Sequence, residues 1–205
     1  MPYPTTFKTT QLDAVNEILG SVGQAPVTVL DQTNPEVALA FTTLMEISRE
    51  VQAEGWVFNR EFKYPLRPNS EGHINIPANV IQMDLSQSYE NSNYDTVIRL
   101  GKLYDKQNHT YEWEQKEYLF DIVWYFPFED LPKPFQDYVT ARAASKAATR
   151  LVGDLNLTQI LTQYELLRRA SCIEYECNQG DYTMFGFQRG SDFYNSYQPF
   201  KALTR

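Results

Sequence analysis

Three glutamates lie close together in the sequence, and paired carboxylates are the residues of this chain with catalytic potential. Glu112 and Glu114 alternate in a predicted strand, so we expect both on one face, and Glu117 follows them. Two carboxyl groups placed across a cleft can hydrolyse a glycosidic bond. The same segment holds Tyr111 and Trp113. A solvated face opposite a buried one explains this pattern more simply, and we favour that interpretation.

The other residue types that serve catalysis are scarce. His73 and His109 are the two histidines, and neither has a Cys or another His at metal-ligand spacing, so we expect structural, solvent-facing roles. Cys172 and Cys177 share a predicted helix about 140° apart, which favours reduced structural thiols. A glycine-rich phosphate loop and a nucleophile elbow are both missing. We therefore predict no catalytic, metal or cofactor site.

A basic stripe is a candidate binding surface. Arg142, Lys146 and Arg150 recur at every fourth residue of a predicted helix, which places them on one face of an otherwise acidic protein. One interpretation is a solvated helix face. The other is a contact for an acidic partner subunit.

The last 25 residues, 181–205, form a second candidate surface. Aromatic side chains are spread among Gly, Ser, Asn and Gln without a clear period: Tyr182, Phe185, Phe187, Phe193, Tyr194, Tyr197 and Phe200. Free coil is usually poor in aromatics. The segment therefore either folds back on its own domain or docks elsewhere, and we favour contact with a neighbouring subunit or a portal.

Composition bounds the class of protein. Of the 205 residues, 42% are hydrophobic and 14% aromatic, which supports a real core and extensive interfaces. The formal net charge of −8 argues against a protein that grips nucleic acid phosphates, but not against a surface that DNA passes. The first ten residues hold no apolar run, and no stretch approaches the roughly 18 apolar residues of a membrane span. We expect a soluble chain made in a cytoplasm.

Four amphipathic helices are predicted, two near each end of the chain. They cover residues 10–22, 34–55, about 134–152 and 156–177. Asn34 and Pro35 give the second helix a clear start, and alanines in the third allow close helix approach. The apolar face of the fourth helix is expected to comprise Leu157, Ile160, Leu161, Tyr164 and Leu167.

Between the helix pairs the period changes to that of β-structure. Strands are expected at 56–64, 73–76, 80–85 and 119–128, with a hairpin of 96–104 and 110–118 around a five-residue loop at 105–109. The fold class is therefore α+β. We expect a four-helix bundle (1–55 and 130–180), an inserted antiparallel β-domain (56–129) and an extended aromatic C-terminal tail (181–205) that docks on neighbours or the portal.

Four segments in the same order and spacing carry a family resemblance. They are residues 14–27 (AVNEILGSVGQAPV), 54–59 (EGWVFN), 130–135 (DLPKPF) and 173–176 (IEYE) with 180–184 (GDYTM) after it. Together they resemble the tail tubular protein A family of short-tailed (podovirus) bacteriophages over nearly the whole chain. The closing Leu203-Thr204-Arg205 also looks like the family's end, whereas residues 65–118 match weakly.

The resemblance implies a structural adaptor, or gatekeeper, of the virion tail that assembles in the host cytoplasm. Such proteins form a dodecameric ring between the portal protein and the tail nozzle protein (tail tubular protein B), and tail fibre proteins attach near that junction. The ring would form part of the DNA ejection channel without sequence-specific DNA binding, membrane contact or cofactor. Two alternatives stay open: a tail-associated hydrolase of capsule or cell-wall glycan that uses the three glutamates, and a soluble binding module with no phage role.

Overall fold

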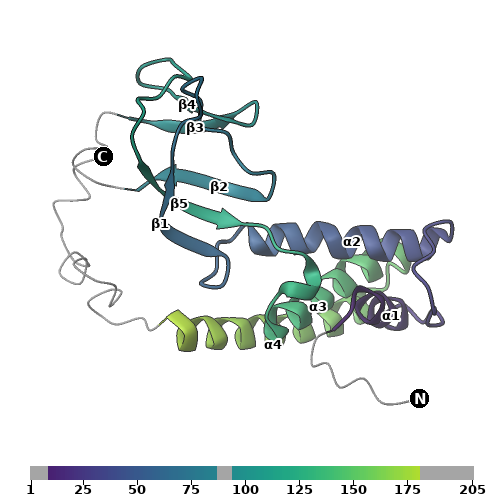
Figure 1. The fold of residues 1–205 in the computed structure, drawn as a ribbon. Helices are drawn as coiled ribbons and strands as arrows, with labels where there is room; N and C mark the ends of the chain where they lie inside the picture. The colour runs from purple at the N-terminus through teal and green to yellow at the C-terminus, as the bar shows by residue number, and fades with distance from the viewer. Residues whose placement is uncertain (1–8, 87–93, 181–205) are drawn as a thin grey trace, which may run out of the picture. The chain divides into compact units, whose positions relative to one another are not determined.

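The part of the chain that the structure describes folds into four α-helices and small antiparallel sheets, so the fold is α+β (Figure 1). The computed structural model describes residues 9–86 and 94–180. These residues divide into two compact units. Residues up to Glu54 and from Phe126 to Gln179 form the helical unit, and residues from Gly55 to Tyr125 form the β unit. Each unit is described by itself below.

The first two helices begin at side-chain caps. Helix α1 spans Gln11–Ser21, and Thr10 and Asp13 cap each other's backbone N–H groups in a capping box. Helix α2 spans Pro35–Gln52, and the Asn34 side chain accepts a hydrogen bond of 3.0 Å from the Glu36 backbone N–H. The predicted starts of both helices are thereby confirmed.

Helix α3 supplies the centre of the helical unit. It spans Lys133–Leu151 and follows the short 3₁₀ helix η2 at Phe128–Asp130. Helix α3 packs against both α1 and α2, which also pack against each other. Its alanines at 141, 143, 144, 147 and 148 are all buried, because small side chains let neighbouring helices come close. Phe135 and Tyr138 fill the space at its first turns and are almost fully buried.

Helix α4 spans Leu155–Gly180 and is long but little buried. Cys172 is its single buried residue. The predicted apolar face was wrong in part: Leu157 and Leu161 are half-buried, but Ile160 and Leu167 are 63% and 68% exposed. The reason is that the inner side of α4 is set by its charged residues, which pair with α3 and with the end of α2, rather than by its largest apolar side chains.

A three-stranded antiparallel sheet organises the β unit. Strands β1 (Arg60–Leu66) and β2 (Val80–Leu85) flank β5 (Tyr118–Trp124) in the order β1-β5-β2. Eight buried apolar residues of this unit form one cluster: Ile74, Met83, Leu85, Leu103, Trp113, Tyr118, Phe120 and Ile122. The expected strand at 80–85 is confirmed, and the strand expected at 119–128 is shorter and ends at Trp124.

Two expected strands are not formed as predicted. The first β-strand starts at Arg60 rather than Trp56, because the Asn59 side chain accepts a hydrogen bond of 2.8 Å from the Trp56 N–H and closes a turn. In the segment 73–76, Asn75 makes an isolated bridge to Lys102 instead of a strand.

The hairpin prediction was also wrong. The observed hairpin pairs β3 (Thr96–Arg99) with β4 (Lys102–Asp105) through a two-residue turn at Leu100 and Gly101, whose φ angles are +52° and +71°. The predicted loop at 105–109 is instead a local turn, in which the Asp105 carboxylate accepts hydrogen bonds from Gln107 and Asn108. Leu100 is 92% exposed at the tip of the hairpin.

Candidate functional site

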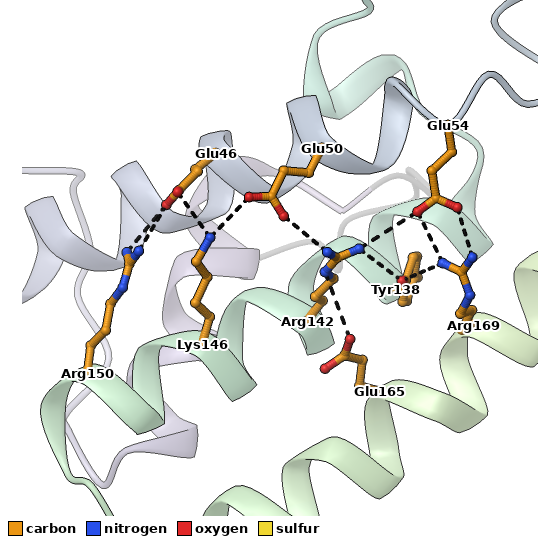
Figure 2. A network of polar contacts seen from close by, with 9 residues as sticks. All are labelled: Glu46, Glu50, Glu54, Tyr138, Arg142, Lys146, Arg150, Glu165 and Arg169. Atoms are coloured by element: carbon orange, nitrogen blue, oxygen red, sulfur yellow. Dashed lines mark hydrogen bonds and ion pairs between the residues drawn. The ribbon is translucent and has the colours of Figure 1, made fainter.

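Two charged stripes of matching spacing face each other on α2 and α3. The basic side chains are Arg142, Lys146 and Arg150 on α3, and the acidic side chains are Glu46, Glu50 and Glu54, on or just after α2 (Figure 2). Both sets recur at every fourth residue, so each occupies one face of its helix. We call these six residues and the groups that they contact the charge ladder.

Along the ladder, each ion pair shares a residue with the next, so that basic side chains of α3 and acidic side chains of α2 alternate. Lys146 Nζ lies 3.0 Å from a carboxylate oxygen of Glu46 and 3.1 Å from one of Glu50. Arg150 lies 3.3 Å from Glu46, and Arg142 lies 3.1 Å from Glu50. The lowest number on α2 therefore meets the highest on α3, so the two helices run antiparallel.

A hydroxyl group and helix α4 complete the ladder at its Glu54 end. The Tyr138 hydroxyl accepts hydrogen bonds from Arg142 at 3.3 Å and from Arg169 of α4 at 2.8 Å. Arg169 also pairs with both carboxylate oxygens of Glu54, at 2.9 and 3.1 Å. Glu165 of α4 lies 3.9 Å from Arg142. The ladder thus connects three helices through four acidic and four basic side chains, as Figure 2 shows.

The pKa values follow these contacts. The hydrogen bond from Lys146 is the largest cause of a lowered pKa at Glu46. Burial opposes the charge of Arg142, but the hydrogen bond to Tyr138 and nearby glutamates outweigh it and raise the pKa of Arg142. The pKa of Arg169 is raised mainly by Glu54, followed by Tyr138. These shifts favour the charged forms of Glu46, Arg142 and Arg169.

This arrangement positions helices, because its ion pairs join side chains of α2, α3 and α4 and the adjoining Glu54. The basic stripe identified in the sequence lies against glutamates of its own chain, and an acidic partner would have to replace them. That partner contact stays a prediction. Sequence reasoning missed the acidic stripe, although its spacing of four residues on the second helix matches that of the basic one.

The glutamates considered for catalysis lie in irregular backbone rather than on a strand. The Glu112 N–H donates to the Thr110 hydroxyl at 3.0 Å, and the chain turns again where the Lys116 N–H donates to the Glu114 carbonyl at 2.7 Å. The strand expected for these residues is therefore wrong, but Glu112 and Glu114 are exposed and Trp113 between them is buried, as expected for a solvated face opposite a buried one. Glu114 pairs with Lys116 at 3.0 Å, and Glu117 pairs with Arg67 at 2.9 Å.

The histidines and cysteines take structural positions. His109 is exposed as predicted, whereas His73 is half-buried, with Nδ1 lying 3.1 Å from Lys102 Nζ and 3.4 Å from a Glu71 oxygen. Cys172 and Cys177 are free thiols, as expected. Burial raises the pKa of Cys172 to about 12, and its thiol donates to the Pro134 carbonyl. Across residues 9–86 and 94–180, no group of three or more His, Cys, Asp or Glu is placed to bind a metal ion.

The predicted aromatic contact residues lie outside the described part of the chain. They are Tyr182, Phe185, Phe187, Phe193, Tyr194, Tyr197 and Phe200. Their role as a portal or neighbour contact stays a prediction. Among the residues that are described, no helix has the length and apolar character required to span a membrane.

Comparison with known proteins identifies similar sequences along most of the chain. A family described as "Tube: Tail tubular protein" matches residues 12–182. The chain is 28% identical to the protein named "Tail tubular protein A" of Klebsiella phage KP34 over 172 residues, which cover 82% of this chain and 88% of that protein.

Proposed function

We propose that this chain, which belongs to the phage tail tubular protein family, is the ring-forming adaptor between the portal and the tail nozzle. The family makes it a structural component of the virion tail. The match over residues 12–182 is the single observation that carries the proposal, because it spans both structural units. We further propose that the ring is dodecameric, acts as a gatekeeper and assembles in the host cytoplasm.

The charges of the chain support a place beside passing DNA. A channel wall that releases DNA needs few unpaired basic side chains, because phosphate binding is an electrostatic attraction. The formal net charge is −8, and the basic stripe on α3 is matched by glutamates of α2. DNA would therefore pass the ring without sequence-specific binding.

The division of the chain into two units supports contacts with different partners. We propose that the helical and β units contact the portal and the nozzle protein at separate surfaces, and that tail fibres attach near the nozzle junction. The aromatic segment 181–205 would dock on a neighbouring subunit or the portal. Such docking orders a segment on binding, and this cost weakens assembly before a portal is present.

Light-scattering mass after size-exclusion chromatography tests the proposal. The chain is measured alone and with the purified portal of the same phage. We expect a 23.8 kDa monomer alone and roughly a dozen copies on each portal, because a symmetric ring repeats one contact around its axis. A chain that stays monomeric beside an assembly-competent portal would overturn the proposal.

Removal of residues 181–205 tests the docking segment separately. We expect a chain that keeps its circular dichroism spectrum and its melting temperature but no longer joins portals. Normal ring formation by the shortened chain would show that the aromatic segment is dispensable.

A further inference from the structure

Most of the outer side of helix α4 is uncharged, on a protein rich in charge. Between Leu155 and Ile173, every exposed residue is apolar or a neutral polar residue, and exposed charges border this stretch at Asp154 and Glu174. Charged residues make up 21% of the whole chain. The three in this stretch, Glu165, Arg168 and Arg169, are half-buried and pair with Arg142, Asp137 and Glu54 respectively.

Large apolar side chains are prominent on this outer side. Six of them are between 37% and 78% exposed: Leu155, Ile160, Tyr164, Leu166, Leu167 and Ile173. They extend along about 27 Å of helix, at 1.5 Å per residue. By helix geometry they form two stripes, Leu155, Leu166 and Ile173 in one and Ile160, Tyr164 and Leu167 in the other, with polar residues such as Gln159 and Gln163 between them. Exposed apolar residues that are scattered singly are ordinary, but a group of them on one element indicates a site of interaction. The cores of protein interfaces are likewise depleted of charged residues.

We propose that the outer face of α4 is covered by a second copy of this chain in the assembled tail. This inference rests on the proposed function, which requires copies to contact one another. A face without charged residues favours an uncharged partner surface. Charged groups of a partner would lose their hydration on binding and would find no opposite charge on this face. DNA is excluded for the same reason, because its phosphates need basic contacts that this face does not have.

A second copy can supply a matching surface from its own sequence. Residues 182–188 (YTMFGFQ) and 193–200 (FYNSYQPF) contain no charged residue. They combine aromatic rings with amide and hydroxyl groups, as the α4 face combines Leu, Ile and Tyr with Asn, Gln, Thr and Ser. Contact between different surfaces of identical chains propagates from copy to copy and closes into a ring when the rotation permits. The chemistry of the face therefore fits a neighbouring copy.

Photo-crosslinking in the assembled tail tests this proposal directly. The photoreactive residue p-benzoylphenylalanine replaces Leu166 in the full chain, and tails are purified from the resulting phage and irradiated. We expect a conjugate of two copies of the 23.8 kDa chain, identified by peptide mapping. The same variant irradiated as a dilute isolated chain is the control, and it should give no such conjugate.

Three other outcomes would overturn the inference: a conjugate with a different tail protein, a crosslink confined to the chain's own residues, or no crosslink at all. Each would leave the portal adaptor role standing, because that role is judged from the copy number on the portal. Conversely, a conjugate of two copies would support the α4 interface even if the chain failed to assemble on the portal.

A charge placed on the face gives an independent measurement. Leu166 is 61% exposed, so Leu166→Glu should leave the isolated chain folded, with an unchanged melting temperature. We expect Leu166→Glu to reduce incorporation into tails at least tenfold and Leu166→Met to retain it. Full incorporation of the glutamate variant would contradict an interface at this position.

Discussion

Helices α3 and α4 follow one another in the chain but use their side chains in opposite ways. Helix α3 buries eleven residues, mostly small or polar, whereas the longer α4 buries Cys172 alone. Yet α4 carries the larger aliphatic residues, including Leu155, Leu166 and Leu167. Burial within one subunit therefore follows the fit between helices rather than the hydrophobicity of each helix. The apolar residues of α4 that find no place inside the subunit are the ones available for assembly.

The first way to sharpen this comparison is to separate the two sides of α4 by thiol reactivity. At pH 8 a thiol with a pKa of about 12 is ionised to about one part in ten thousand, so Cys172 should react with iodoacetamide orders of magnitude more slowly than exposed Cys177. Mass spectrometry of the isolated native chain should show one fast modification. The Cys177→Ser variant should remove it, and two equally fast thiols would contradict the observed inner side of α4.

The second prediction compares deletion of a large side chain from each helix. Phe135→Ala in α3 should lower the free energy of unfolding by about 3–5 kcal/mol, because the ring is fully buried and packs edge-on against Tyr175 at 5.9 Å. Leu167→Ala in α4 should change it by less than about 0.5 kcal/mol in the isolated chain. Urea unfolding of the helical signal measures both. Equal losses would show that α4 is packed as tightly as α3.

The third prediction concerns the ladder that joins these helices to α2. A double-mutant cycle of Glu50→Gln and Lys146→Met should give a coupling free energy of about 0.5–1 kcal/mol that declines in 1 M salt, because the pair is partly solvated. The control pair is Arg67 and Glu117, whose side chains are 75% and 46% exposed. We expect less coupling there, and a larger value at the control pair would refute the special role of the ladder.

Sequence reasoning succeeded where local chemistry decides the structure. The cap at Asn34, the apolar periodicity of the first helix and the small residues of the third helix made the helices predictable. It failed where a side chain redirects the backbone, as Asn59 and Asp105 do. It also failed to predict which face of α4 packs against the other helices. The inward side of α4 depends on ion pairs such as Arg169 with Glu54, which lie 115 residues apart in the sequence and are invisible to periodicity.

For the candidate site, the basic stripe was visible because one helix contains it. The acidic stripe was not predicted as its partner. Pairing the two stripes requires the relative register of two helices that are separated in the sequence by the entire β region. The pattern itself was present at Glu46 and Glu50, and matched spacing on two amphipathic helices could have suggested it. Pairing charges between elements is thus a usable signal once their packing order is known.

The fourth and smallest effect is expected at Glu17 of α1, which faces charged groups of both α3 and α4. Its side chain reaches solvent, but partial burial, followed by repulsion from Asp137, raises its pKa above 4.5, while Arg168 and Lys133 oppose that shift. In the folded chain Glu17 therefore retains its proton to a higher pH than in the unfolded chain. Ionisation at neutral pH then costs stability, and that cost disappears below pH 4.5, where both states bind the proton.

Glu17→Gln should accordingly raise the melting temperature slightly at pH 7, and the gain should vanish as the pH falls to about 4. Calorimetry of both proteins across this range measures the difference. The control is Asp13→Asn on the same helix, which removes a capping carboxylate and should lower stability at pH 7 instead. A loss of stability in Glu17→Gln at pH 7 would mean that attraction to Arg168 and Lys133 outweighs burial and Asp137. The charges around Glu17 would then stabilise the folded chain on balance, as is expected of the ladder.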